Sequence, residues 1–190
     1  VMLAVCLSAC ATDPSISSAG REGAAKGEVR WAIALHGGAG TIDRDADPAL
    51  IAQYERSLAV ALAEGRDRLN RGETAMDVCV AVVRILEDDP LFNAGRGAAF
   101  NERGGHELDA SVMDGATMRC GAVAGVRTVK NPVSLARLVM EKTNHVLLAG
   151  DGAEEFAGVM GVERVPNSYF DTDARRQTVS YTHLRAHETL

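Results

Sequence analysis

The chain has 190 residues, with 20 Lys and Arg residues against 26 Asp and Glu residues, so its formal net charge is −6. Apolar residues make up 46% of the sequence, which is typical of a globular domain rather than a disordered or collagen-like chain. Only 4% of the residues are aromatic, and such an acidic chain lacks the basic, stacking-rich surface of nucleic-acid-binding proteins. We therefore expect no nucleic-acid partner.

The first 28 residues differ in composition from the rest of the chain. Residues 1–9 form an apolar run that ends in small residues directly before Cys10, which resembles a bacterial lipoprotein signal followed by a lipidated cysteine. Residues 11–28 are rich in Ala, Ser and Gly and are typical of a flexible tether. We expect an exported protein, periplasmic or anchored to a membrane through Cys10. The alternative for residues 1–9 is a buried strand or a frayed end.

Hydrophobic periodicity and capping residues predict alternating strands and helices after residue 29. Because an Asp-Gly pair suits a type I′ hairpin, part of the sheet is expected to be antiparallel, and the fold class is α/β (α+β) rather than a purely parallel sheet. The expected elements are a strand at 30–35, helices at 48–70 and 75–88 with Thr74 as cap, a hairpin at 108–126 that turns at Asp114-Gly115, a helix opened by Asn131 and Pro132, a strand at 146–149, and a helix capped by Asp151 that ends at Gly158 or Gly161.

Two cysteines lie beyond the N-terminal segment, at Cys79 and Cys120. Their distance cannot be read from the sequence, so a disulfide between them stays open. Free cysteine packs like a small apolar residue, and we expect two unpaired thiols.

A glycine loop follows the first predicted strand of the domain, at residues 36–40 (HGGAG). Consecutive glycines adopt unusual dihedral angles and leave amide N–H groups free to face an anion or an oxyanion. A lipase-like oxyanion loop would require a Gly-x-Ser-x-Gly nucleophile motif, which the chain lacks. The alternative is a simple tight turn.

A second loop, at residues 86–97 (LEDDPLFNAGRG), combines acidic residues with Pro and Gly. Such a loop can turn backbone carbonyls toward a hard cation, although its spacing does not match a calcium-binding loop. The alternative is a helix end followed by a solvated acidic loop. Further on, His106, Glu107 and Asp109 enter the predicted hairpin, where alternation puts His106 on one face and the two acids on the other. We expect these three residues to be structural.

Five sequence blocks stand out together: HGGAGTI at 36–42, PLFNAGRGAAF at 90–100, HELDASVMDG at 106–115, CGAVAGVRTVKNP at 120–132 and LVMEKTNHVLLAGDGAEEFA at 138–157. In this order they resemble the isoaspartyl peptidase/L-asparaginase family, the plant-type asparaginases. The resemblance runs from about residue 30 to about residue 176. It implies the αββα sandwich of N-terminal-nucleophile hydrolases, of which this chain would carry the N-terminal half only.

The resemblance also implies a reaction. In this family the precursor cuts itself, and the new N-terminal Thr of the β-subunit is the nucleophile, with its own α-amino group as base. The implied reaction is hydrolysis of the asparagine side-chain amide or of a β-aspartyl peptide bond. The family nucleophile lies in a Gly-Thr-Val-Gly motif, which this sequence lacks. We expect an α-subunit portion that is inactive by itself.

Several residues match supporting positions of the family. Asn93 matches an Asn near the nucleophile that is important for self-cleavage. His36, Gly37, Gly38 and Gly40 match a loop that conditions the scissile peptide. The family also holds a structural Na⁺ through backbone carbonyls, and no organic cofactor is expected. Here the matching carbonyls belong to Leu86, Glu87, Asp89, Phe92, Ala94 and Arg96.

The expected partners are the substrate (L-asparagine or a β-aspartyl dipeptide), a missing β-subunit, and a second copy in the (αβ)₂ assembly of the family. Residues 29–178 are expected to form the α-subunit portion, and residues 179–190 (VSYTHLRAHETL) a tail outside the family pattern. Two alternatives stay open. One is a glycosylasparaginase, which cleaves a sugar–asparagine link, and the other is a non-catalytic exported lipoprotein that uses this half-fold for binding.

Overall fold

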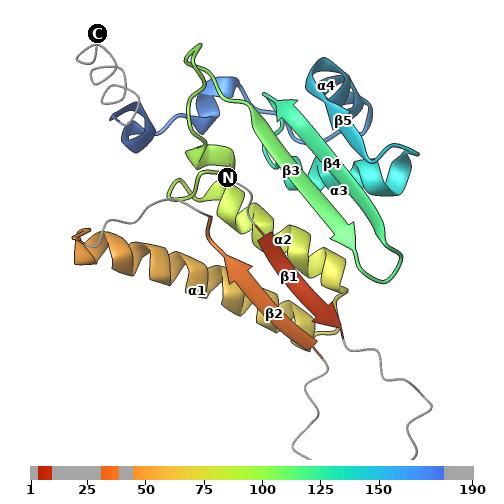
Figure 1. The fold of residues 1–190 in the computed structure, drawn as a ribbon, viewed down its shortest axis with the longest axis horizontal. Helices are drawn as coiled ribbons and strands as arrows, with labels where there is room; N and C mark the ends of the chain where they lie inside the picture. Colours follow the sequence, from red (N-terminus) through yellow and green to blue (C-terminus); the bar gives the residue numbers. More distant parts are fainter. Residues whose placement is uncertain (1–3, 10–30, 39–44, 178–190) are drawn as a thin grey trace, which may run out of the picture.

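Helices and strands alternate along the described residues, which are 4–9, 31–38 and 45–177 in this computed structural model (Figure 1). In chain order the elements are β1 Ala4–Ala9, β2 Trp31–His36, α1 Pro48–Asn70, α2 Ala75–Asp88, the 3₁₀ helix η1 Gly95–Gly97, β3 Leu108–Asp114, β4 Arg119–Val126, α3 Pro132–Lys142, β5 Leu147–Ala149, α4 Gly150–Val159 and the 3₁₀ helix η2 Asn167–Phe170.

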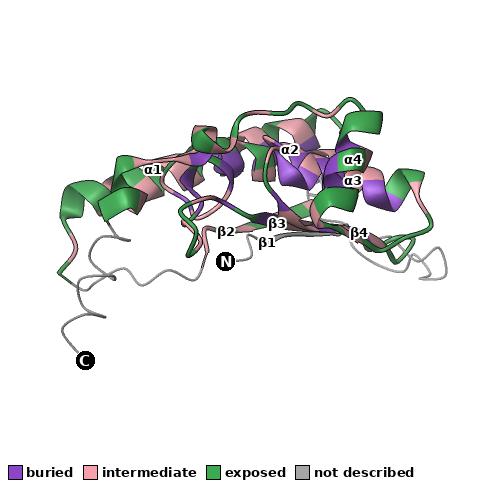
Figure 2. Ribbon diagram, turned by 90° about the horizontal axis from the view of Figure 1, so that it is seen from above, coloured by how far each residue is buried: buried purple, intermediate pink, exposed green. Residues whose placement is uncertain are grey.

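The strands form two small sheets. In the first, β1 runs antiparallel to β2, and in the second, β3 and β4 form an antiparallel hairpin with β5 parallel to β4. The second sheet is therefore mixed, and the sequence correctly predicts that part of the strand pairing is antiparallel. The helices lie on one side of the strand layer (Figure 2). This mixed architecture agrees with the fold class expected for an N-terminal-nucleophile hydrolase, and the described residues form one helical layer and one strand layer of that sandwich.

The N-terminal segment contributes a strand. Residues Ala4–Ala9 pair with Trp31–His36, which agrees with the strand alternative for this segment. Cys10 and the residues of the predicted tether lie outside the described residues, so lipidation stays a prediction. Within the described part of the chain, no helix is both long and apolar enough to cross a membrane.

The core consists of two apolar clusters, one for each sheet. The first joins α1 and α2 to β2, with Val78, Val82 and Phe92 at its centre. The second joins α3 and α4 to the β3–β4 hairpin. In the second cluster, Gly121 allows close approach, because a Cβ atom there would lie 2.3 Å from the carbonyl oxygen of Ala136. Helix α3 therefore rests directly on the backbone of β4.

Helix starts are partly as predicted. Thr74 caps α2, since its hydroxyl accepts the N–H of Asp77 at 3.2 Å. Asn131 is the N-cap residue of α3 and Pro132 its first residue, as predicted, but the side chain of Asn131 makes no capping hydrogen bond. Its side-chain amide donates to Asp88 Oδ1 at 3.1 Å, and the N–H of Val133 donates instead to the carboxyl of Glu87 in α2. A side chain of α2, and not the side chain of Asn131, therefore accepts a free N–H group at the start of α3.

Helix α4 begins differently from the prediction. Its cap residue is Ala149, and Asp151 lies inside the first turn, where its carboxylate pairs with Arg127. The long-range ion pair competes with local capping. The end of the helix agrees with the prediction, because Val159 is its last residue and Gly161 takes a left-handed conformation with φ +65°.

The hairpin turn is longer than the predicted two-residue turn. Asp114 pairs with Arg119, so residues 115–118 form the loop, and Met118 has φ +59°. The carboxylate of Asp114 accepts the N–H of Ala116 at 3.1 Å and the hydroxyl of Thr117 at 2.6 Å. The sequence predicted a type I′ turn at Asp114-Gly115. These hydrogen bonds to Asp114 instead stabilise the wider turn over residues 115–118.

Among the described residues Cys79 and Cys120 form no disulfide, and both side chains are half-buried rather than fully buried.

Candidate active site

The glycine loop begins where β2 ends, at His36. The N–H of Gly38 donates to Nδ1 of His36 at 3.1 Å, which fixes the first turn of the loop, and Gly38 has φ +110°. A Cβ atom on Gly37 would lie 3.1 Å from Cε1 of Phe92, so the loop contacts the ring of Phe92. Gly40 lies outside the described residues, and its expected role stays a prediction.

The loop that contains Asn93 follows α2 and is anchored to α1. The ring of Phe92 is buried and meets Tyr54 edge-on at 5.8 Å between centroids. The hydroxyl of Tyr54 donates to the carbonyl of Leu91 at 3.1 Å, and Ser57 bonds to the carboxylate of Asp89. These contacts fix the loop on the same side of α1 as the glycine loop.

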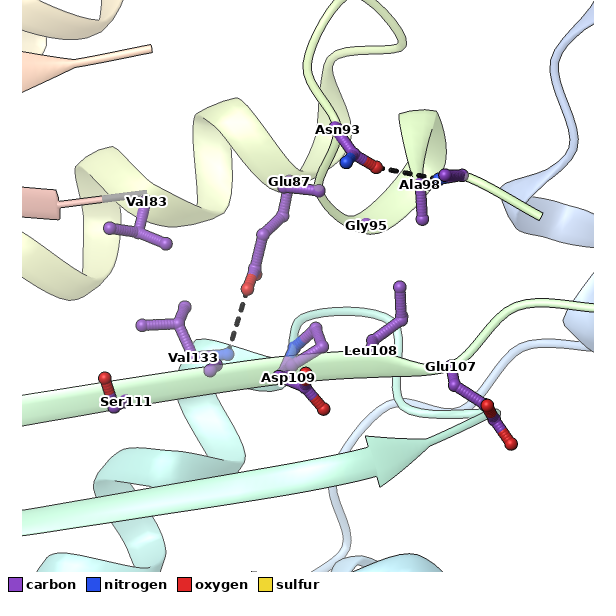
Figure 3. Close-up of a pocket in the computed structure, with 14 residues that line it drawn as sticks. Val83, Glu87, Asn93, Gly95, Ala98, Glu107, Leu108, Asp109, Ser111 and Val133 are labelled. Atoms are coloured by element: carbon purple, nitrogen blue, oxygen red, sulfur yellow. Dashed lines mark hydrogen bonds between the residues drawn. The ribbon is translucent and has the colours of Figure 1, made fainter. Parts of the chain in front are cut away.

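The side chain of Asn93 has a defined orientation. Its Oδ1 accepts the N–H of Ala99 at 2.7 Å, across η1 (Figure 3). Among the described residues, its NH₂ group has no hydrogen-bond partner. Asn93 lines a cleft of about 200 Å³ between α2, this loop and β3. The residue therefore offers a free donor to that cleft.

Glu87 lies in the same cleft and is 3% exposed. Figure 3 shows its side chain extending from α2 toward the start of α3, where Oε1 accepts the N–H of Val133 at 3.0 Å. Its Oε2 has no partner among the described residues. Burial raises the pKa of the Glu87 carboxyl from 4.5 to about 8, and the Val133 N–H only partly opposes this shift. The cleft thus contains a carboxyl group that is neutral over much of the physiological pH range.

Two of the six carbonyls expected to bind Na⁺, those of Glu87 and Phe92, lie against the glycines of η1. A Cβ atom on Gly95 would lie 2.1 Å from the carbonyl oxygen of Glu87, and one on Gly97 would lie 2.1 Å from that of Phe92. Both glycines are therefore required where the loop folds back on its own carbonyls. The carbonyls of Asp89 and Ala94 each accept one backbone N–H, at 3.3 Å and 3.0 Å, which leaves each a second lone pair. The guanidinium of Arg96 lies over the ring of Tyr169, 5.9 Å from its centroid.

An oxygen-only ligand set of this kind suits a hard cation rather than a transition metal. Among the described residues, no group of three His, Cys, Asp or Glu side chains is arranged to hold a metal ion. The residues present thus fit a cation bound by backbone carbonyls.

The sequence missed one buried polar pair beside the loop. His106 is 1% exposed, with Nε2 2.8 Å from Asp171 Oδ1 and Nδ1 3.2 Å from the carbonyl of Ala99. Asn167 holds the backbone of His106 on both sides, at 2.9 and 3.0 Å. The predicted alternation holds, because Glu107 and Asp109 are exposed. A buried His in such a strand implies a polar partner, but the sequence does not identify Asp171, which lies 65 residues away.

The chain is similar to known proteins over most of its described length. A sequence profile described as asparaginase matches residues 29–189. The matched range runs past residue 178, where we expected the family pattern to end, and that boundary stays a prediction.

Three relatives illustrate the similarity. The chain is 52% identical over 147 residues to the probable isoaspartyl peptidase/L-asparaginase 2 of Arabidopsis thaliana, which covers 75% of this chain and 44% of the relative. It is 50% identical over 145 residues to the isoaspartyl peptidase of Escherichia coli (strain K12), covering 75% and 45%. It is 46% identical over 130 residues to the plant-type L-asparaginase of Pyrococcus abyssi, covering 68% and 41%.

The matched part of the chain spans less than half the length of these relatives. Its two loops meet at the contact between Gly37 and Phe92, beside Asn93. With the profile match over residues 29–189, these findings assign the chain to the asparaginase family.

Proposed function

We propose that this chain is the α-subunit portion of a hydrolase that cleaves the side-chain amide of L-asparagine or a β-aspartyl peptide bond. The observation that carries the proposal is the contact of Gly37 with Phe92, which brings the glycine loop beside the Asn93 loop. Two of the relatives described above are an isoaspartyl peptidase and a probable isoaspartyl peptidase/L-asparaginase, and their names support this substrate class. They favour it over glycosylasparaginase, and they give no support to a non-catalytic binding lipoprotein.

The proposed nucleophile is the threonine of a Gly-Thr-Val-Gly motif. The 190 residues do not contain this motif. The Thr hydroxyl attacks the side-chain carbonyl carbon, its proton passes to the α-amino group, and ammonia or an amino acid leaves. Water then hydrolyses the acyl-enzyme to release aspartate. The role of this chain is to supply hydrogen-bond donors near the reacting atoms, namely the NH₂ group of Asn93 and the amides of the glycine loop.

The same proposal includes autoprocessing and assembly. The glycine loop, with His36, Gly37, Gly38 and Gly40, would condition the peptide bond that is cut to expose the Thr. The partners would be the β-subunit with that Thr and a second αβ unit. No organic cofactor takes part in this scheme.

A structural Na⁺ belongs to the proposal as well. Its ligands would be the carbonyls of Leu86, Glu87, Asp89, Phe92, Ala94 and Arg96. When bound, the ion would stabilise the turn between α2 and η1, and so the loop that carries Asn93. The close approach of the Glu87 and Phe92 carbonyls to Gly95 and Gly97 supports this assignment.

Export is the remaining part of the proposal. The apolar run before Cys10 supports a lipidated N-terminus at that residue. Metabolic labelling with a radioactive fatty acid, compared between wild type and Cys10→Ser, tests it. Equal labelling of the two proteins would reject lipidation at Cys10.

A chimera tests the enzymatic proposal. Residues 29–178 replace the matching segment of the Escherichia coli isoaspartyl peptidase, and release of aspartate from L-asparagine and a β-aspartyl dipeptide is measured. We expect activity, and we expect Asn93→Ala to reduce it about a hundredfold, as for a lost oxyanion donor. The matched control is Asn144→Ala, since Asn144 is exposed in the turn after α3.

Two results would reject the proposal. One is a folded chimera that releases no aspartate from either substrate. The other is an Asn93→Ala variant as active as the Asn144→Ala control.

A further inference from the structure

His106 is a fully enclosed side chain with both ring nitrogens hydrogen-bonded. The ring lies against Phe100, with 4.3 Å between centroids, and meets Phe170 edge-on at 6.1 Å. Its two polar contacts lead to Asp171 and to the carbonyl of Ala99. The ring is fully buried, whereas 22% of the Asp171 side chain is exposed. Because both ring nitrogens have polar partners, the ring can orient the groups that it contacts.

The chemistry of the two partners fixes how the ring binds. A backbone carbonyl only accepts hydrogen bonds, so Nδ1 of His106 donates to Ala99 across 3.2 Å. On the other side, Nε2 lies 2.8 Å from Oδ1 of Asp171. The second oxygen of Asp171 pairs with the guanidinium of Arg176, which also lies over the ring of Phe100. The ring is thus locked in one orientation from both sides.

Ala99 links His106 to the cleft through the two peptide groups on either side of its Cα atom. The carbonyl of Ala99 accepts from His106, and the N–H of Ala99 donates to Oδ1 of Asn93 at 2.7 Å. Only the side-chain oxygen of Asn93 is used in this bond, so the amide cannot flip without losing it. The NH₂ group of Asn93 is consequently the part that remains available to the cleft (Figure 3).

We propose that His106 and Asp171 are positioning residues for Asn93. Asp171 orients the imidazole, and the imidazole holds the carbonyl of Ala99. The N–H of the same residue holds Oδ1 of Asn93, which leaves the NH₂ group of Asn93 for the reacting atoms. The inference rests on the proposed function for the importance of Asn93, and on the described contacts for the network itself. Neither residue touches the substrate in this scheme.

Two substitutions at one position separate positioning from packing. In His106→Asn, the side-chain NH₂ takes about the place of Nδ1 and keeps the donor to Ala99. In His106→Gln, the NH₂ takes about the place of Nε2 and keeps the contact with Asp171 instead. Each variant loses one ring contact, and His106→Asn loses one methylene more of buried volume than His106→Gln. A purely structural role would therefore make His106→Asn the more damaging variant, whereas positioning of Ala99 makes His106→Gln the more damaging one.

The first measurement is hydrogen exchange of the Ala99 amide by NMR in the 190-residue chain, which needs no activity. We expect about tenfold faster exchange in His106→Gln and near wild-type exchange in His106→Asn, the size expected from one weakened hydrogen bond. Equal exchange in the two variants, or faster exchange in His106→Asn, would overturn the proposal. Asp171→Leu provides a second variant at a more exposed site, and unchanged exchange there would remove Asp171 from the network.

The second measurement is the kinetics of the chimera with the same variants. We expect His106→Gln to lower kcat about tenfold with KM unchanged, because a mispositioned donor loses contacts made in the transition state. His106→Asn should keep kcat within about threefold of wild type. A fall in kcat of the same size in both variants, or a larger fall in His106→Asn, would overturn the proposal. If the wild-type chimera is inactive, the proposed function is wrong. The hydrogen-exchange measurement still shows whether His106 controls the Ala99 amide, because it needs no activity.

Discussion

The buried carboxyl of Glu87 predicts that the stability of the fold decreases as the pH rises. Glu87 is 3% exposed, and only one of its oxygens has a partner among the described residues. Burial raises its pKa to about 8, against 4.5 for the group in the unfolded chain. Below pH 4.5 both states keep the proton. Between pH 4.5 and about 8 the unfolded state releases it while the folded state holds it, so the free energy of unfolding falls through this window and levels off above it.

The size of the effect follows from the same numbers. The difference between 4.5 and about 8, at about 1.4 kcal/mol per pH unit, gives an upper bound of about 5 kcal/mol. The carboxyls with a lowered pKa, those of Glu73, Asp77, Asp114 and Glu154, stabilise the fold above their ordinary pKa values and lose this stabilisation as the pH falls below them. They do not overlap with the window of Glu87.

Glu87→Gln isolates this contribution. The amide oxygen of Gln keeps the acceptor for the N–H of Val133 and carries no charge at any pH. We expect equal stability of wild type and variant near pH 5, and a variant more stable by a few kcal/mol, at most about 5, at pH 9. The control is Glu107→Gln, which removes an exposed carboxylate at the edge of the same cleft. The control should follow the pH profile of the wild type.

Urea unfolding at a series of pH values measures the effect. Trp31 is the single tryptophan of the chain and packs against the cluster between α1 and α2, so its fluorescence reports unfolding. A wild-type profile that does not fall between pH 5 and 8, or a Glu87→Gln profile that falls as steeply as the wild type, would refute the reasoning.

Three further predictions concern the fold and the loop. Replacing Na⁺ by a bulky organic cation should lower the melting temperature of the wild-type protein. Gly95→Ala should remove this dependence on Na⁺, because the added Cβ atom would lie 2.1 Å from the carbonyl oxygen of Glu87. A Gly95→Ala protein whose melting temperature depends on Na⁺ as in the wild type would contradict the cation site. Gly121→Ala should lower the free energy of unfolding in urea by about 1–3 kcal/mol, because the new methyl group overpacks against α3. The control Gly115→Ala lies in open space and should leave the free energy of unfolding nearly unchanged. Equal effects of the two substitutions would argue against close packing at Gly121. Glu154→Ala should lower the free energy of thermal unfolding by about 3 kcal/mol, because the backbone N–H groups of Arg127 and Thr128 lose their acceptor. An unchanged free energy of unfolding would exclude a stabilising role for these two hydrogen bonds.

Local patterns in the sequence predicted most elements and some of their ends. The helix at Pro48–Asn70 and the cap at Thr74 are confirmed, because both depend on neighbours along the chain. The start of α3 at Asn131 and Pro132 is also confirmed, although Glu87 from α2, and not the Asn131 side chain, accepts the N–H of Val133. The cap at Asp151 is wrong, because α4 begins after Ala149 and the Asp151 carboxylate pairs with Arg127. Propensity describes what a residue can do locally, and tertiary partners decide whether it does so.

The candidate site shows the same division. The glycine loop is recognisable from its residue types, whereas the role of Asn93 is implied only by the resemblance to the family. The contact between Gly37 and Phe92 is not recognisable from the sequence, since it depends on how β2 and α2 pack on α1. The pairing of His106 with Asp171 likewise depends on η2 and its neighbours returning to the start of β3. Such long-range pairs have no signature in a single sequence.

The central claim is that the two loops form the surroundings of a threonine that another polypeptide segment provides. The most direct test measures aspartate release from L-asparagine and a β-aspartyl dipeptide by the purified 190-residue chain and by the chimera, under the same conditions. The account predicts release by the chimera and none by the chain alone. Sustained release by the chain alone would show that it carries its own nucleophile, and would contradict the account.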